Sequence, residues 1–218
     1  MRSIMHMVTA AAAVMMLMSG CATKRGEVAL QVPQRGAMQQ QVSAAAKTVF
    51  VNSVTDKRIF EVKPANPSTP SLDPNEDQSA ATKVRAIGRK RGGFGQAFAN
   101  FLLKDGQTVE TVVSDSVKQA FAEAGYRVLE NKSAVTPDTY VVDVSIDKFW
   151  SWMNPGFWAI TLSTEIGTEM TIKKPDSTQS ETLYVKAEDH FQTGVEGNWI
   201  EVMQTALKSY VEELKNRI

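Results

Sequence analysis

Residues able to perform acid–base, nucleophilic or metal chemistry are few and widely separated in this 218-residue sequence. It holds two histidines, His6 and His190, and a single cysteine, Cys21. His190 has Glu188 and Gln192 beside it on one face of a predicted strand, which is too few ligands for a zinc site. No Gly-x-Ser-x-Gly nucleophile motif is present. Several carboxylates on polar strand faces are most simply explained as solubilising charges: Asp143, Asp147, Glu165, Glu169 and Glu188. We therefore predict a protein that is not an enzyme and that uses no metal or cofactor.

A cationic, glycine-rich segment has the most unusual local chemistry of the chain. Arg89, Lys90 and Arg91 directly precede Gly92 and Gly93. Cationic side chains beside glycine N–H groups can hold a phosphate or another anion. The segment lacks the Gly-Lys-Ser/Thr sequence that opens a helix in phosphate-binding loops. The sequence therefore favours a solvated glycine hinge, with an anion-binding loop as the alternative.

Aromatic residues gather around a Pro-Gly turn later in the chain. Trp150, Trp152 and Phe157 are candidate docking residues for a partner or for the membrane interface, because such side chains dominate interface energetics. The more ordinary alternative places Trp158 and Trp150 in the core and the others over the edge of the sheet.

The start of the chain has the organisation of a secretory signal. Residues 1–20 contain a cation at Arg2, an apolar run from Met7 to Met18, and two small residues. The apolar run is shorter than the roughly 20 residues needed to span a membrane, so we expect it to be cleaved. A lone cysteine in an exported chain has no disulfide partner, so its modification is the simpler expectation.

Leu17-Met18-Ser19-Gly20-Cys21 resembles the bacterial lipobox, in which cleavage occurs before the cysteine and the thiol receives a diacylglycerol. The usual leucine three positions before the cysteine is replaced by Met18. Two or three acyl chains on one residue make membrane release negligible. Ala22 follows, where enterobacterial lipoproteins retained at the inner membrane have Asp. The resemblance thus implies the periplasmic face of the outer membrane.

Residues 21–46 predict a flexible tether, because they are small and polar and show no sustained periodicity. A tether of about 25 residues would span roughly 25–30 Å. The alternative is that part of it, around Val28 to Val32, pairs as an edge strand. Residues 47–218 are expected to form one domain. Four prolines in residues 64–81 predict a long exposed loop, either functional or disordered.

Periodicity within the domain predicts an α+β fold. Apolar residues at spacings of three and four predict helices over 108–124 and from about residue 198 to the end. Alternating apolar residues predict strands over 139–149, 157–172 and 183–191, after an early strand at 48–54. Three hairpin-linked strands, each polar on one side, favour an antiparallel sheet. We therefore expect a two-layer sandwich, with this sheet packed against two amphipathic helices.

These features together resemble the YajG-like uncharacterised bacterial outer-membrane lipoproteins. The resemblance is carried by the lipobox, Thr55-Asp56-Lys57-Arg58 after the first strand, Ala124-Gly125-Tyr126 after a helix, strand 141–146 and the last helix. That family has no settled activity, so it implies no functional residues.

Composition excludes a strongly charged partner as the basis of function. Removing residues 1–20, with Arg2 as their one charged residue, leaves 23 of the 24 basic residues against 24 acidic ones. No global field favours nucleic acid. We expect a lipid-anchored binding or scaffold module with a protein partner in the cell envelope. The alternative is a periplasmic protein that binds an anion or small ligand through the Arg89–Gly95 loop.

Overall fold

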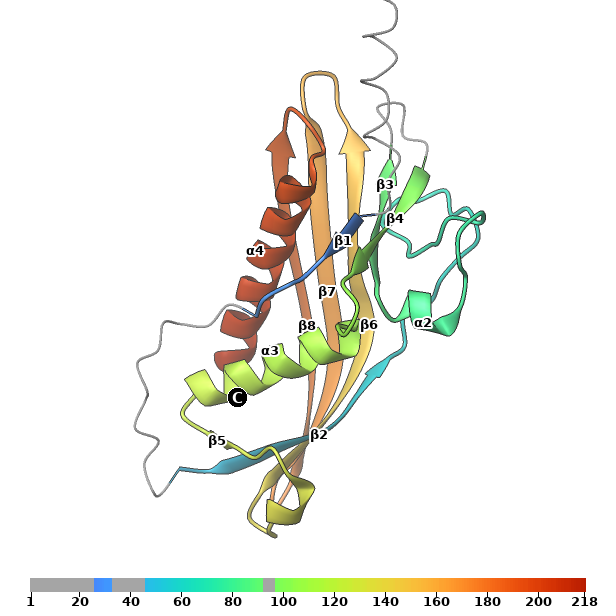
Figure 1. Cartoon of the computed structure of the whole chain (residues 1–218). Helices are drawn as coiled ribbons and strands as arrows, with labels where there is room; N and C mark the ends of the chain where they lie inside the picture. Colours follow the sequence, from blue (N-terminus) through green and yellow to red (C-terminus); the bar gives the residue numbers. More distant parts are fainter. Residues whose placement is uncertain (1–25, 33–45, 92–96) are drawn as a thin grey trace, which may run out of the picture.

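A computed structural model describes residues 26–32, 46–91 and 97–218 (Figure 1). Within these ranges, eight strands form one mixed sheet, and two long helices lie on one of its faces. The strands are β1 (Gly26–Val28), β2 (Thr48–Asp56), β3 (Ala86–Arg91), β4 (Ala97–Leu103), β5 (Arg127–Val128), β6 (Tyr140–Pro155), β7 (Ile160–Lys173) and β8 (Thr178–Phe191). The helices are α2 (Ala80–Lys83), α3 (Val109–Glu123), α4 (Glu196–Lys215) and the 3-10 turn η1 (Lys132–Ala134). Among the described residues, no helix combines the length and apolar character that crossing a membrane requires.

The predicted hairpins exist, and their strands are longer than the sequence suggested. β6 pairs antiparallel with β7 from Val141–Lys173 to Pro155–Ile160, and β7 pairs antiparallel with β8 along its full length. The turn between β6 and β7 differs from the prediction, because β6 continues through Pro155. Phe157 and Trp158 therefore lie in the turn, where alternation had placed them at the start of a strand.

The rest of the sheet is mixed, and the prediction of a purely antiparallel sheet was wrong there. β2 and β3 both run parallel to β6, β2 along its first half and β3 at Gly88–Ser151. β4 pairs antiparallel with β3, and β1 pairs parallel with β4. Parallel neighbours need a long crossover connection, and the chain between β2 and β6 contains α3. The early strand's composition gives no information about the direction of its partner.

β1 lies within the stretch predicted to be a tether. Gly26–Val28 forms the strand beyond β4, as in the edge-strand alternative, although the strand ends where that alternative placed its start. Leu30 continues this segment into the domain, exchanging two hydrogen bonds with the side chain of Gln107. The sheet therefore includes residues from Gly26 to Val28, some twenty residues before the predicted start of the domain at residue 47.

The two amphipathic helices were correctly predicted. Thr108 caps α3 through a reciprocal pair of hydrogen bonds with Thr111, and Gly125 follows with φ +89°. α4 begins at Glu196, two residues before the predicted start at about residue 198, and Asn198 donates to the carbonyl of Thr193. Both helices bury their apolar faces in the main core.

The segment between β2 and α2 covers part of the opposite face of the sheet. Leu72 lies with Trp150 and Trp152 in a second buried cluster that also contains Ala86 and Leu102. Residues 71–73 of the proline-rich stretch are thus buried. The prediction of a long exposed loop was wrong for these residues. The predicted two-layer sandwich, with helices on one face of the sheet, did not include this segment on the opposite face.

A carboxylate fixes the bulge where β2 pairs with β6. Asp143 of β6 accepts hydrogen bonds from Ser53 and Asn52 of β2, each at 2.6 Å, and pairs with Lys173 of β7 at 2.9 Å. The register of β2 shifts at this point, between Val51 and Ser53. The hydrogen bonds from Ser53 and Asn52, helped by Lys173, lower the pKa of Asp143 to about 2.

Replacement of Asp143 by Asn should produce a pH-dependent loss of stability. The folded pKa lies below the ordinary 3.8, so the ionised carboxylate stabilises the fold above that pH, and the benefit is lost as pH falls towards 2. Urea unfolding should show native protein more stable than D143N by at most about 2 kcal/mol at pH 6, with the difference shrinking below pH 4. Asp147→Asn, an equal charge change at an exposed position of the same strand, should cost less at pH 6. A gap of equal size at pH 6 and pH 2 would contradict this role.

Candidate functional site

The cationic segment does not form a single cluster. Arg89 and Lys90 are consecutive residues of β3 and point to opposite faces of the sheet. Arg89 pairs with Asp73 of the covering segment at 3.3 Å, whereas Lys90 lies 5.7 Å from the ring centroid of Phe101. The side chain of Arg91 and the residues Gly92 and Gly93 lie outside the described part of the structure.

Arg89 nevertheless borders a cavity. The space is about 540 Å³ and is lined by Lys63, Pro64, Asp73, Pro74, Asn75, Arg89 and Ala97. The Arg89 side chain is only 8% exposed, and its Nε finds no acceptor among the described residues. Asn100 supports the wall by accepting from the backbone N–H of Asp73 and donating to Glu76. Arg89 Nε could therefore donate a hydrogen bond to an anionic or carbonyl oxygen in the cavity. Asp73, however, already offsets the positive charge of Arg89.

The predicted aromatic docking residues are also separated. Trp150 and Trp152 are 1% and 6% exposed and lie beneath the segment between β2 and α2. Trp150 donates from Nε1 to the carbonyl of Pro67 at 3.2 Å and meets Phe60 edge-on. Phe157 is 91% exposed, so the three residues are not exposed together.

Trp158, which alternation assigned to the core, is the partner of Phe157 at the surface. It is 84% exposed, and the two rings meet edge-to-face with centroids 4.8 Å apart. The sequence signal for this position was Pro155-Gly156. This pair ends β6 and places the residues that follow in a turn.

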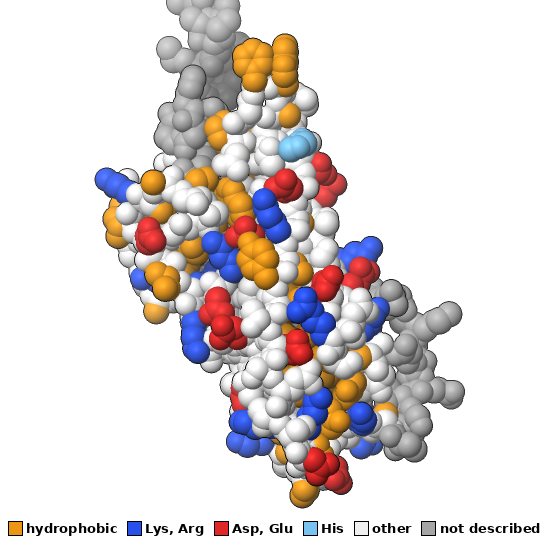
Figure 2. Space-filling model, turned by 180° about the vertical axis from the view of Figure 1, so that it is seen from behind, with side chains coloured by type: hydrophobic (Ala, Val, Ile, Leu, Met, Phe, Trp, Pro, Cys, Tyr) orange, Lys and Arg blue, Asp and Glu red, His pale blue; other side chains and the backbone are white. Residues whose placement is uncertain are grey.

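Two stretches of chain around these rings are called here the hairpin tip (residues 154–161 and 191–195). Both stretches lack Asp, Glu, Lys, Arg and His. They lie together because Ile160 pairs with Phe191, and Val195 adds a side chain that is 56% exposed. Figure 2 shows hydrophobic side chains exposed at this end, with charged side chains distributed over the body below.

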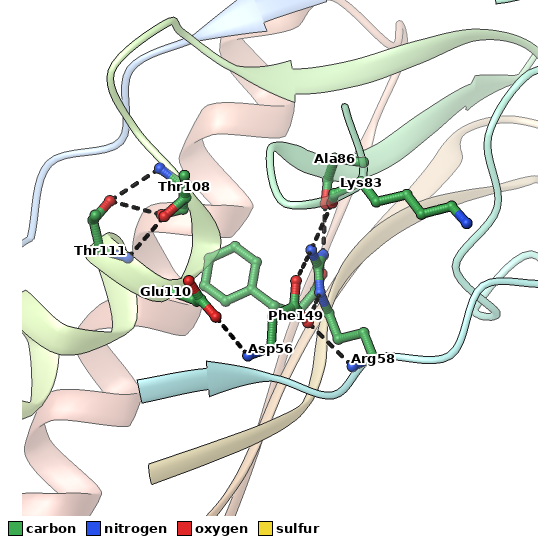
Figure 3. Close-up of polar contacts among 8 residues, drawn as sticks. All are labelled: Asp56, Arg58, Lys83, Ala86, Thr108, Glu110, Thr111 and Phe149. Carbon is green, nitrogen blue, oxygen red and sulfur yellow. Dashed lines mark hydrogen bonds and ion pairs between the residues drawn. The ribbon is translucent and has the colours of Figure 1, made fainter. Parts of the chain in front are cut away.

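A buried arginine forms the most connected polar centre (Figure 3). Arg58 has a fully buried side chain that binds Asp56 through Nε at 2.8 Å and Nη2 at 2.7 Å. Its guanidinium also donates to the carbonyls of Ala86, Phe149 and Lys83. These partners come from three separate parts of the chain, so the Arg58 guanidinium holds those parts together.

The remaining candidates, His190 and Glu188, each contact a neighbouring side chain of the sheet. His190 is exposed, and its Nδ1 lies 3.0 Å from the hydroxyl of Thr161. Glu188 pairs with Lys186, and this contact lowers the pKa of the glutamate. Within the described ranges, no three His, Cys, Asp or Glu side chains are grouped to hold a metal ion.

A second cavity, about 1180 Å³, lies between α3, the start of α4 and residues 29–32. Its lining mixes apolar side chains such as Leu30 and Ile200 with polar ones such as Gln107 and Lys118. None of the buried side-chain atoms that lack a partner in the described structure lies in this lining. The part of the groove that the structure describes therefore offers space without a buried polar atom that lacks a partner.

Comparisons with known proteins give structural similarity only. No family model matches the sequence, and no curated protein matches it. A Xanthomonas campestris protein of the DUF330 family is similar in structure at 13% identity and a TM-score of 0.47, covering 88% of this chain and 92% of that one. A lipoprotein of Neisseria meningitidis is similar at 11% identity and a TM-score of 0.31, covering 78% of this chain and 99% of that one. Similarities this low carry no functional argument, and they do not show the YajG-like family.

Replacing Arg58 by Lys should destabilise the protein strongly. A lysine keeps the charge but cannot reproduce the planar set of donors that reaches Asp56 and three carbonyls. The expected loss in urea unfolding is about 3 kcal/mol, the scale for breaking a buried ion pair. Arg85→Lys is the matched control, because Arg85 binds Leu103 O and Asp105 at a partly exposed site, and it should cost about 1 kcal/mol or less. Equal losses in R58K and R85K would contradict a special role for Arg58.

Proposed function

We propose that this protein is a lipoprotein anchored through Cys21 to the periplasmic face of the outer membrane. There it acts as a non-enzymatic binding or scaffold module of the bacterial envelope. The observation that carries the proposal is the short distance in sequence between the lipobox-like residues and the folded body. Only residues 22–25 separate Cys21 from Gly26, the first residue of β1.

This spacing changes the kind of anchoring that the sequence suggested. A tether of about 25 residues would have let the domain move roughly 25–30 Å from the lipid. With β1 starting at Gly26, the five residue steps from Cys21 reach at most about 18 Å. A lipid on Cys21 would thus hold one end of the domain directly at the membrane surface.

The pairing of the buried charged side chains with one another supports a binding role over a catalytic one. Arg58 and Asp56 neutralise each other beneath the sheet edge, and Arg89 pairs with Asp73. Catalytic acids and bases typically sit in a cleft with a perturbed pKa and a path to substrate. The lowered pKa of Asp143 instead arises where three strands meet, from side chains that hold those strands together. We assign the binding role to the surface of the domain.

Replacement of Cys21 by Ser tests the anchor. Native protein should carry a diacylglycerol on Cys21, detected by mass spectrometry as an acylated mature amino terminus, and should fractionate with the outer membrane. C21S should lose the acyl mass and membrane association, because no thiol remains to be modified. Ala22→Asp is the control for destination, since it keeps the lipid but introduces the residue of inner-membrane retention. A native protein with a free thiol at Cys21 or an uncleaved amino terminus overturns the proposal.

A second candidate function is binding of an anion at Arg89, favoured by its Nε, which has no acceptor among the described residues and lies beside the 540 Å³ cavity. Lys63 lines the same space and could contribute a second cation. A ligand at 100 times its dissociation constant stabilises the folded state by about 2.7 kcal/mol.

Inorganic phosphate should therefore raise the melting temperature of the native protein if this site operates. The double variant Arg89→Gln/Asp73→Asn removes both charges together, which avoids leaving Asp73 buried without its partner, and it should lose the shift. Absence of a shift in the native protein across a wide phosphate range removes this candidate.

A further inference from the structure

We propose that the hairpin tip is a second, non-covalent membrane contact. In this proposal Phe157 and Trp158 insert into the interface between lipid headgroups and acyl chains, in the same leaflet that holds the lipid on Cys21. The inference rests on the proposed lipidation and adds a membrane-binding surface to it. Its occupant is a phospholipid surface.

The exposure of the two rings is the first observation. Phe157 and Trp158 are 91% and 84% exposed, whereas the other tryptophans are buried: Trp150, Trp152 and Trp199. Aromatic side chains each bury about 150–250 Å² when covered, so leaving both in water is costly. Tryptophan is enriched at the membrane interface, where its ring body meets lipid and its N–H meets headgroups and water.

The absence of charged residues from the two stretches of the hairpin tip is the second observation. Residues 154–161 and 191–195 contain no ionisable side chain, and the nearest ones are His190 and Glu196 at the margins. A charged group at this position would resist transfer towards the acyl chains. The tip is also a protruding turn, so it suits a fluid surface that needs no complementary pocket.

The direction of the strands brings the anchor to this end. β6 runs towards the tip, β3 runs parallel to β6, and β4 runs back antiparallel to β3. β1 is parallel to β4, so its first residue, Gly26, is its end nearest the tip. Figure 1 shows β1 beginning on the side of the molecule where the β6–β7 hairpin turns.

The register of the strands gives the distance between Gly26 and the hairpin tip along the sheet. Gly26 pairs with Phe101, Phe101 with Gly88, and Gly88 with Ser151, so Gly26 lies at the level of Ser151 in β6. Pro155, the last residue of β6, is four residues beyond Ser151, or about 13 Å at the rise of a strand. The five residue steps back from Gly26 to Cys21 span at most about 18 Å. The lipid and the two rings can therefore reach one plane.

Fluorescence in reconstituted vesicles tests the inference directly. The full-length mature lipoprotein is placed in phosphatidylethanolamine–phosphatidylglycerol vesicles made with or without brominated acyl chains, which quench tryptophans at the bilayer. Native protein should show a component quenched by the brominated lipid and shielded from aqueous acrylamide. Trp158→Phe should lose this component, because the other three tryptophans are buried in the protein.

Two further variants control for general effects. Phe157→Ser should reduce the quenching of Trp158, since the rings contact each other. Ile59→Ser/Val62→Ser removes two exposed apolar side chains from the body, 76% and 85% exposed, and should leave the quenching unchanged. Circular dichroism of each variant establishes that its fold is intact.

The outcomes separate this inference from the proposed function. A native protein that carries no acyl mass and does not float with vesicles fails the proposed lipidation. An acylated protein that floats with vesicles, while Trp158 stays open to acrylamide and is not quenched by brominated lipid, overturns the inference alone. Shielding from acrylamide without bromine quenching also overturns it, because a protein then covers the tip.

Discussion

The sheet depends on one edge of β6 serving two parallel strands. β2 pairs with β6 as far as Ile146, and β3 pairs with it at Ser151. Between these points the carbonyl of Phe149 has no neighbouring strand to donate to it, and an unpaired buried carbonyl is costly. Arg58 donates to this carbonyl and to that of Ala86, where β3 begins. A guanidinium thus stands in for the missing backbone donors.

This junction also sets where the chain enters the domain. Because Arg58 holds the start of β3 against β6, it fixes the position of β4 and then of β1, which pairs outside β4. The covering segment from residue 59 to α2 begins at the same arginine and ends at Lys83, whose carbonyl Arg58 also binds. The location of β1 therefore follows from how the gap beside β6 is filled.

The sequence predicted what local periodicity determines. Alternation identified β6 to β8 and the spacing of apolar residues identified α3 and α4, because each pattern reflects which face is buried. The parallel pairings were not predictable, since the residues of β2 fit either direction. Arg89 and Lys90 formed one cationic run in sequence, yet strand geometry separates them across the sheet. Asp56 and Arg58 were noted as part of a family-like motif, but their role as a junction needed partners 25 to 91 residues away.

Anchoring at the hairpin end, as proposed above, affects the orientation of the domain on the membrane more than its affinity for the membrane. In the anchoring proposed above, several acyl chains on Cys21 would already make dissociation negligible, so two inserted rings would add little to retention. A single attachment at Cys21, however, would leave rotation of the body about that point unconstrained. A second contact at the tip removes much of that freedom, at small entropic cost because the lipid already holds the tip near the surface. Orientation then decides which surfaces remain for a partner: the end at η1 and the β7–β8 turn lies farthest from the membrane, and the groove along α3 faces sideways. A scaffold module gains from this arrangement, because a partner meets the same face of every anchored copy.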